Sequence, residues 1–203
     1  MKAIVLSVLR FLSVLITGLW VVFVVGVAAQ EKKAQDKKVN KEAREAVLRM
    51  ADLVGQKDMV LLKQQAEAVA KSIESLDEVM NLLRARTKGG LGVGDTPGAI
   101  LPDGMEAKLV NISRRPLGQP QLAKESKALV RLAQVNAAIA QISEARTSVD
   151  GMKDAKSWQK WSADMRQSAI ELAEAAEAMD AARVKVAAKK LNTSCTECHD
   201  KFR

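Results

Sequence analysis

The carboxy-terminal stretch 154-DAKSWQKWSADMRQSAIELAEAAEAMDAARVKVAAKKLNTSCTECHDKFR-203 predicts two consecutive helices and indicates a helical fold. Its apolar residues recur at steps of three and four, the repeat of a helix with one buried face. Asp154 is the predicted N-cap of the first helix, and a short turn around Asp180 precedes the second. The expected buried faces are Trp158, Trp161, Met165, Ala169, Leu172, Ala176 and Met179 in the first helix, and Val184, Ala188, Leu191, Cys195, Cys198 and Phe202 in the second.

Similar spacing continues upstream. Asn40 is the predicted N-cap of a helix that ends near Gly55, and Asp58 that of a longer helix whose buried face runs to Leu83. A further helical segment spans 121–146. The first of these helices is expected to bury Ala43, Val47, Met50 and Val54, the second Leu62, Ala66, Val69, Ile73, Leu76, Met80 and Leu83, and the third Leu122, Leu129, Leu132, Ile139 and Ile142.

Five helical segments, some joined by short connections, predict an all-α protein. Aromatic residues are only 3% of the 203 residues, tyrosine is absent, and no stretch alternates as a strand does. The most economical arrangement is an up-and-down antiparallel four-helix bundle with one extra helical element. Two assignments of that element are open: the first two helices act together as one broken helix, or 121–146 is an insertion.

The segment 88–120 interrupts the helical pattern, because it holds seven of the eleven glycines and all four prolines. It cannot form one continuous helix, although 103–113 predicts a short helix capped by Asp103. Its run 89-GGLGVG-94 is not a phosphate-binding loop, since it follows a helix rather than a strand and no Lys-Ser/Thr pair ends it. We expect a glycine-rich loop within a single domain over 30–203.

Residues 1–29 predict an export signal. Lys2 and Arg10 precede an uncharged run over 11–29, and Val27 and Ala29 occupy the positions that a signal peptidase reads. An uncleaved membrane anchor is the alternative, because nineteen uncharged residues approach the length of a spanning helix. No cysteine follows the run closely enough for a lipoprotein anchor. In both cases the functional part is expected outside the cytoplasm, in the periplasm or an equivalent compartment.

The charge pattern limits the partners. Of the 32 basic residues two lie within 1–29, which leaves 30 against 24 acidic residues, a net charge of +6. The signs are mixed along helical sequence rather than gathered with aromatic residues, so nucleic-acid binding is not expected. A mildly basic surface would steer an acidic partner protein.

The only two cysteines, Cys195 and Cys198, stand beside the only histidine, His199. On a helix these positions project from one face. A zinc site needs four ligands, and this motif supplies three at most. A thioredoxin-like redox pair normally follows a strand, and no strand is predicted in this sequence. Covalent haem attachment uses all three, two sulfurs as thioethers and the imidazole on the iron. The structural alternative is a buried disulfide, or two core thiols, beside a surface histidine.

From about Ala155 to Arg203 the sequence resembles the class II cytochromes c, the cytochrome c-prime group, whose haem motif lies at the carboxyl end of a four-helix bundle. The resemblance implies one covalent haem c per chain, with its iron. It makes Cys195 and Cys198 the thioether cysteines and His199 the proximal ligand. It also places Phe202 and Arg203 near the haem.

The resemblance also nominates a residue for the other face of the iron. Family members carry an arginine followed four residues later by the side chain that covers this face, and that spacing runs from Arg44 to Leu48. A leucine there implies a five-coordinate, high-spin iron open to NO or CO. A methionine would complete the coordination and favour electron transfer. The candidate methionines are Met50, Met59, Met80, Met105 and Met165.

The predicted function is electron transfer by a mono-haem class II cytochrome in the periplasm, with a redox protein as partner. The alternative is a haem protein that binds a small diatomic gas. An enzyme such as a peroxidase is not expected, because His199 as ligand leaves no second histidine for acid–base work. Membrane contact is expected only through an uncleaved amino-terminal segment. The resemblance also implies a homodimer formed through the first helices.

Overall fold

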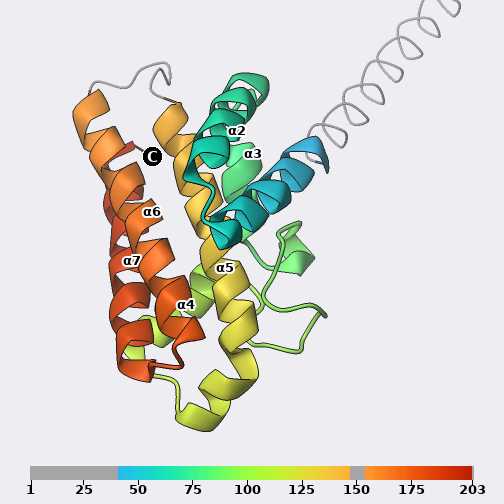
Figure 1. The fold of residues 1–203 in the computed structure, drawn as a ribbon, viewed down its shortest axis with the longest axis vertical. Helices are drawn as coiled ribbons and strands as arrows, with labels where there is room; N and C mark the ends of the chain where they lie inside the picture. Colours follow the sequence, from blue (N-terminus) through green and yellow to red (C-terminus); the bar gives the residue numbers. More distant parts are fainter. Residues whose placement is uncertain (1–40, 147–153, 203) are drawn as a thin grey trace, which may run out of the picture. The chain divides into compact units, whose positions relative to one another are not determined.

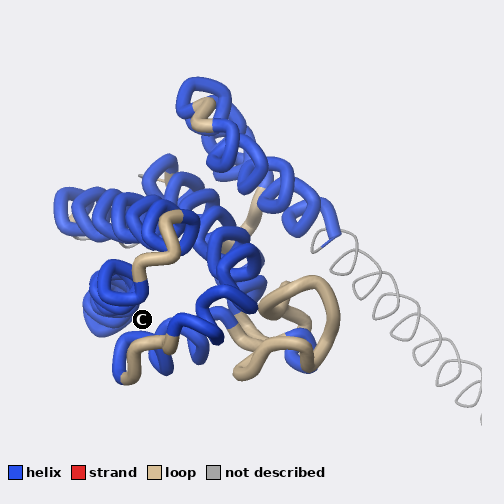
Figure 2. The backbone as a smooth tube through the Cα atoms, turned by 60° about the horizontal axis from the view of Figure 1, so that its bottom comes forward, coloured by secondary structure: helices blue, strands red, loops and turns tan. Residues whose placement is uncertain are grey.

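The computed structural model describes residues 41–146 and 154–202, which form helices, turns and loops without any strand (Figures 1 and 2). The chain divides into two units, Met1–Glu42 and Ala43–Arg203, and the fold given below is that of the second. The predicted export segment, the cap at Asn40 and the break at 147–153 lie outside the described residues. None of the described helices is both long and apolar enough to cross a membrane.

The helices of the second unit follow one another with mostly short connections. Residues 43–56 are helical. The later elements are α2 (Met59–Ser72), α3 (Asp77–Met80), a 3₁₀ turn (Asn81–Leu83), a second 3₁₀ turn (Arg86–Lys88), α4 (Met105–Arg114), α5 (Gln119–Ala145), α6 (Ala155–Glu177) and α7 (Ala181–Phe202).

Helix α5 is the centre of the fold (Figure 1). It packs against α6 on one side and against α2 on another, α6 packs against α7, and α7 packs against α4. Helix α4 returns to α5 through an ion pair between Lys108 and Glu125. These four helices therefore close into a bundle, which confirms the all-α prediction.

The extra element is the amino-terminal pair, residues 43–56 and α2. The first of these helices is tied to α5 by Arg131, whose Nη1 lies 2.6 Å from Asp52 Oδ1 and whose Nη2 donates to the Leu48 carbonyl at 3.3 Å. The predicted buried positions of this helix are all buried. The segment 121–146 is thus the core helix of the bundle rather than an insertion.

The sequence of α5 explains its central place. Every residue from Val135 to Ser143 is buried, so this part of the helix is covered on all sides. Its polar side chains bond to the helix itself. Asn136 Nδ2 donates to the Leu132 carbonyl at 2.8 Å, and Ser143 Oγ donates to the Ile139 carbonyl at 2.9 Å. One helix can therefore carry packed layers on two faces.

The prediction of one helix over 58–83 is wrong, because α2 ends at Ser72. The Glu78 carboxylate accepts two backbone N–H groups in the break, at 2.8 and 3.0 Å. Arg146, at the end of α5, donates to two carbonyls of the same break, at 2.9 and 2.6 Å. Side chains thus take over backbone groups that a continuous helix would have bonded, and the chain restarts as α3.

The cap predicted at Asp103 is also wrong. Helix α4 begins at Met105, and its N-cap residue is Gly104, with no side-chain bond. The Asp103 carboxylate instead pairs with the Arg86 guanidinium and accepts the backbone N–H of Arg86 at 2.9 Å and of Val93 at 3.4 Å. Burial acts to raise the pKa of Asp103, but these interactions outweigh it and the pKa is lowered. Asp103 therefore fastens the glycine-rich segment.

Candidate functional site

A pocket opens inside the bundle between α7, α6 and the end of α3. Its empty space, counted together with the open solvent at its mouth, is about 440 Å³. Its lining comes from α7 (Ser194, Cys195, Cys198, His199), α6 (Trp158, Trp161, Ser162, Met165), α5 (Ser143), α4 (Glu106) and the α3 region (Met80, Leu83). The three residues of the Cys-x-x-Cys-His motif thus share one cavity.

Helix α7 presents the motif because Cys195, Cys198 and His199 fall on one face of a continuous helix. All three are half-buried, and both cysteines are free thiols rather than a disulfide. Burial raises the pKa of Cys195 to about 12, and the charge of Glu106 acts in the same direction. Burial also raises the pKa of Cys198. Both sulfurs are therefore thiols at neutral pH.

Helix α6 supplies the apolar wall. Trp158 is buried, and its Nε1 donates to the Ser143 carbonyl on α5 at 2.7 Å. Met165 is buried beside it, whereas Trp161 is half-buried at the mouth. The Lys201 ammonium lies 5.6 Å from the centroid of the Trp161 ring, a cation–π distance. This wall presents an apolar surface to the pocket, and the ring N–H of its buried Trp158 is satisfied within the bundle.

The two helices of the site are joined where α6 begins. The carboxylate of Asp154, the predicted cap, accepts the Ser157 N–H at 3.0 Å, which confirms that prediction. Its other oxygen lies 3.0 Å from Lys201 Nζ on α7. Hydrogen bonds from Ser157, with the Lys201 charge, hold the pKa of Asp154 well below its usual value. The last turn of α7, two residues after His199, is thereby fixed to α6.

Helix α4 reaches the pocket with Glu106, whose position depends on a buried ion pair. Lys108 Nζ lies 2.6 Å from Glu125 Oε2, and the two side chains are 1% and 8% exposed. Lys108 also donates to the Leu101 carbonyl at 3.0 Å, and Gln121 donates to the second Glu125 oxygen at 3.1 Å. These extra bonds compensate the cost of burying two charges and hold α4 against α5.

Leu48, predicted over the open face of the iron, is not among the residues that line the pocket. It is half-buried against the core, and its carbonyl accepts a bond from Arg131. Arg44 donates to the Gly90 carbonyl at 3.4 Å. In this structure the pair therefore packs the amino-terminal helix and the glycine-rich segment.

Two of the five candidate methionines, Met80 and Met165, line the pocket. Met50 and Met105 are buried elsewhere in the core, and Met59 is exposed. Of the residues that the resemblance placed near the haem, the side chain of Phe202 and all of Arg203 lie outside the described part of the chain.

Glu106 and Leu83 were not foreseen as site residues. They reach the pocket only because the chain breaks after α2 and the short α4 docks on α7, which no periodicity records. Ser143, Ser162 and Ser194 were also not predicted from the sequence as site residues. Each of them is next in sequence to a residue that was predicted to be buried. Ser194 Oγ donates to the Leu191 carbonyl at 2.8 Å, so it needs no other partner.

The chemistry of this site fits a covalently attached haem. Two free thiols and one imidazole project from one helix face into a cavity with aromatic and thioether walls. Within 41–146 and 154–202 no three His, Cys, Asp or Glu side chains are placed to share one bare metal ion. Thioether attachment has no such requirement, because each sulfur bonds a different carbon of the porphyrin.

Residues 120–203 match the family model described as Cytochrome C'. This segment is therefore similar to the cytochrome c-prime family. It comprises α5, α6 and α7 with the Cys-x-x-Cys-His motif, and the family implies a class II c-type cytochrome with covalently bound haem c and its iron. Family proteins are typically periplasmic. No curated protein and no solved structure matches the chain.

Proposed function

We propose that the protein is a mono-haem cytochrome that transfers electrons in the periplasm. The observation that carries this proposal is the shared pocket, into which α7 directs Cys195, Cys198 and His199 while two methionines line the same cavity. A thioether with a histidine is an axial ligand pair of electron-transfer cytochromes.

Each residue has a definite role in this proposal. Cys195 and Cys198 would hold the porphyrin as thioethers, and His199 would bind the iron. The bound haem supplies a one-electron ferric/ferrous couple. Trp158 would cover the buried side of the haem, and Met80 or Met165 would be available as a thioether ligand to the iron. We propose no enzymatic activity, since no second imidazole exists in the chain.

The competing candidate is gas binding, and the apolar character of the pocket favours it. If neither methionine reaches the iron, the side chains around the open position include Leu83 and Trp158, which cannot ligate. A diatomic molecule such as CO or NO would then be the only sixth ligand. The two candidates differ in spin state, which makes them separable by spectroscopy.

Absorption and EPR spectra of the purified holoprotein, in both oxidation states and with CO, test the proposal. We expect a low-spin haem that takes up CO only slowly, and a Met80→Leu or Met165→Leu variant that becomes high-spin and binds CO at once. Leu48→Met is the matched control and should leave the spectrum unchanged. A high-spin wild type that binds CO directly would instead establish the gas-binding function.

A further inference from the structure

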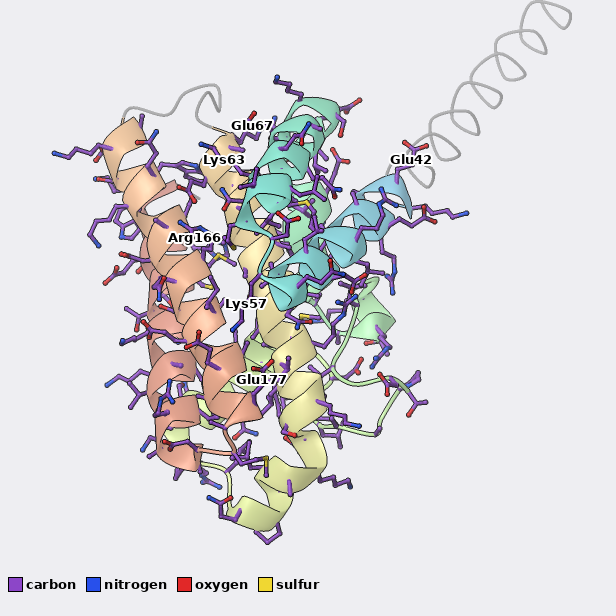
Figure 3. The ribbon with its side chains drawn as sticks, in the orientation of Figure 1. Glu42, Lys57, Lys63, Glu67, Arg166 and Glu177 are labelled. Atoms are coloured by element: carbon purple, nitrogen blue, oxygen red, sulfur yellow. The ribbon has the colours of Figure 1, made fainter. Side chains whose placement is uncertain are left out.

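A second hollow lies on the other side of α6, among α2, α5 and α6. Its empty space, counted together with the open solvent at its wide mouth, is about 1860 Å³. Figure 3 shows two of its charged residues, Lys63 and Glu67, on α2. We call this hollow the basic groove, because its charged lining consists of five cations and two anions: Lys63, Lys71, Arg146, Lys156, Lys160, Glu67 and Glu144.

The positive charge of the groove is only partly neutralised inside the protein. Lys160 Nζ lies 2.6 Å from Asp164, and Glu144 is paired with Arg166 at 3.1 Å, so these two pairs cancel. Lys63, Lys71 and Lys156 are exposed, and within the described chain no carboxylate lies within ion-pair distance of them. They are therefore available to carboxylates of another molecule.

Only one helix separates the groove from the haem pocket. On α6, Trp158 and Trp161 line the pocket while Gln159 and Lys160 line the groove. On α5, Ser143 lines the pocket and the next residue, Glu144, lines the groove. A helix with its side chains is about 10–12 Å across, so a surface seated in the groove lies about that far from the pocket.

We propose that the basic groove docks the acidic surface of the protein with which the haem exchanges electrons. This inference rests on the proposed electron-transfer function and names the partner of that site. The lysines are spread over two helices on exposed, flexible stems, which suits the polar rim of a transient protein complex. The buried amide in the groove, Gln141, already donates to Glu144 at 3.3 Å. The described lining of the groove therefore lacks the buried, inward-pointing donor that is typical of a small-ligand site.

Binding of an acidic polypeptide tests the groove without any use of the haem. The probe is poly-L-glutamate of about twenty residues, titrated into the full holoprotein and followed by backbone-amide NMR. We expect shifts around Lys63 and Lys156, and about tenfold weaker binding in the double variant K63E/K156E. The matched control is K124E/K127E, the same charge reversal on two exposed lysines of α5, and should change the affinity less than about twofold.

The control lies well away from the groove. Nineteen residues separate Lys127 from Arg146 along α5, a distance of about 28 Å at ~1.5 Å per residue. Equal weakening in both double variants would mean that only net charge matters, and would overturn the proposal. Inorganic phosphate that displaces the peptide at similar concentration would mark a small-anion site, which also overturns it.

Electron transfer to charged oxidants supplies the second readout. Hexacyanoferrate(III), an anion, takes one electron from the reduced protein and becomes hexacyanoferrate(II). Tris(phenanthroline)cobalt(III), a cation, takes one electron in the same way. K63E/K156E should slow the first reaction and speed the second by about tenfold each at low salt, with little change in the control.

The two arms separate the two proposals. If the wild type holds no reducible haem, the electron-transfer function fails, whereas peptide binding still reports on the groove. If the haem reacts with both oxidants but the groove variant behaves as its control, the docking proposal fails and the function stands.

Discussion

Helix α6 borders two hollows that differ in almost every physical respect. On the pocket side stand Trp158, Met165 and the thiols of α7, and the polar groups there bond within the bundle. On the groove side stand Gln159, Lys160 and the exposed Lys63, Lys71 and Lys156, which have no ion-pair partner among the described residues. The apolar pocket favours a large apolar cofactor, whereas the basic groove favours the charged surface of another molecule.

The difference arises from the helical repeat itself. Residues 158, 161, 162 and 165 share one face of α6, and 159, 160 and 163 share another, so adjacent residues serve different surroundings. The comparison implies that changes on the pocket face alter haem attachment and stability, whereas those on the groove face alter association with charged molecules.

Replacing Cys195 and Cys198 together by alanine should have the largest effect. Without the sulfurs no thioether forms, so haem staining on a denaturing gel should disappear completely. Binding of poly-L-glutamate to the groove should stay within about twofold of wild type, since neither cysteine lines the groove. Haem that survives denaturation in this variant would show that another attachment exists.

Lys108→Met should cost about 3–5 kcal/mol of unfolding free energy, because it leaves Glu125 as an uncompensated buried charge. The double variant K108M/E125L is the control and should recover most of that loss, because no charge remains buried. Urea unfolding of the holoproteins measures both. Helix α4 contributes Glu106 to the pocket but no residue to the groove. Lys108→Met should therefore shift the haem spectrum and leave the binding of poly-L-glutamate to the groove unchanged. A double variant as unstable as the single one would contradict this account.

The fold was predictable where the sequence pattern is local and uninterrupted. Steps of three and four marked the buried face of α6, and Asp154 was identified as its cap because its carboxylate can accept a free N–H of the first turn. The same reasoning failed over 58–83. The apolar stripe continues there, but Glu78 and Arg146 bond the backbone of the break, and Arg146 comes from a distant segment.

The site was predictable only on α7, where three chemical groups occur within five residues. Glu106 joins them through tertiary packing of the short helix α4, which leaves no periodic mark in the sequence, whereas Met80 and Met165 were two of five candidate methionines that the sequence could not rank. Leu48 was nominated by a family spacing, yet the helix that carries it is tied to α5 through Arg131. The family match begins at residue 120, so the amino-terminal half has no counterpart against which that spacing is fixed.

Trp158→Phe should lower the unfolding free energy by about 1 kcal/mol, because it removes the 2.7 Å hydrogen bond to the Ser143 carbonyl, which keeps only the Arg146 N–H at 3.2 Å. Gln159→Ala, one residue along on the groove face, is the matched control and should change stability by no more than about 0.5 kcal/mol. Chemical denaturation of the holoproteins compares them. Similar losses in both variants would mean that the two faces of α6 are not energetically distinct.

Asp154→Asn should have the smallest effect, and one that depends on pH. Asparagine still caps α6, so the variant removes mainly the charge that faces Lys201. The pKa of Asp154 is held below its usual value of 3.8, so its contribution to stability is present above that value and is lost as the pH falls through the lower, native-state pKa. Wild type should therefore be the more stable protein at pH 7, and the difference in urea midpoint should shrink steadily below about pH 4.

Asp164→Asn, which removes the exposed partner of Lys160 on the groove side, is the control for loss of one surface carboxylate. If the midpoints of wild type and Asp154→Asn run parallel down to about pH 2, the tie between α6 and the last turn of α7 is not ionic and the pocket is closed by packing alone.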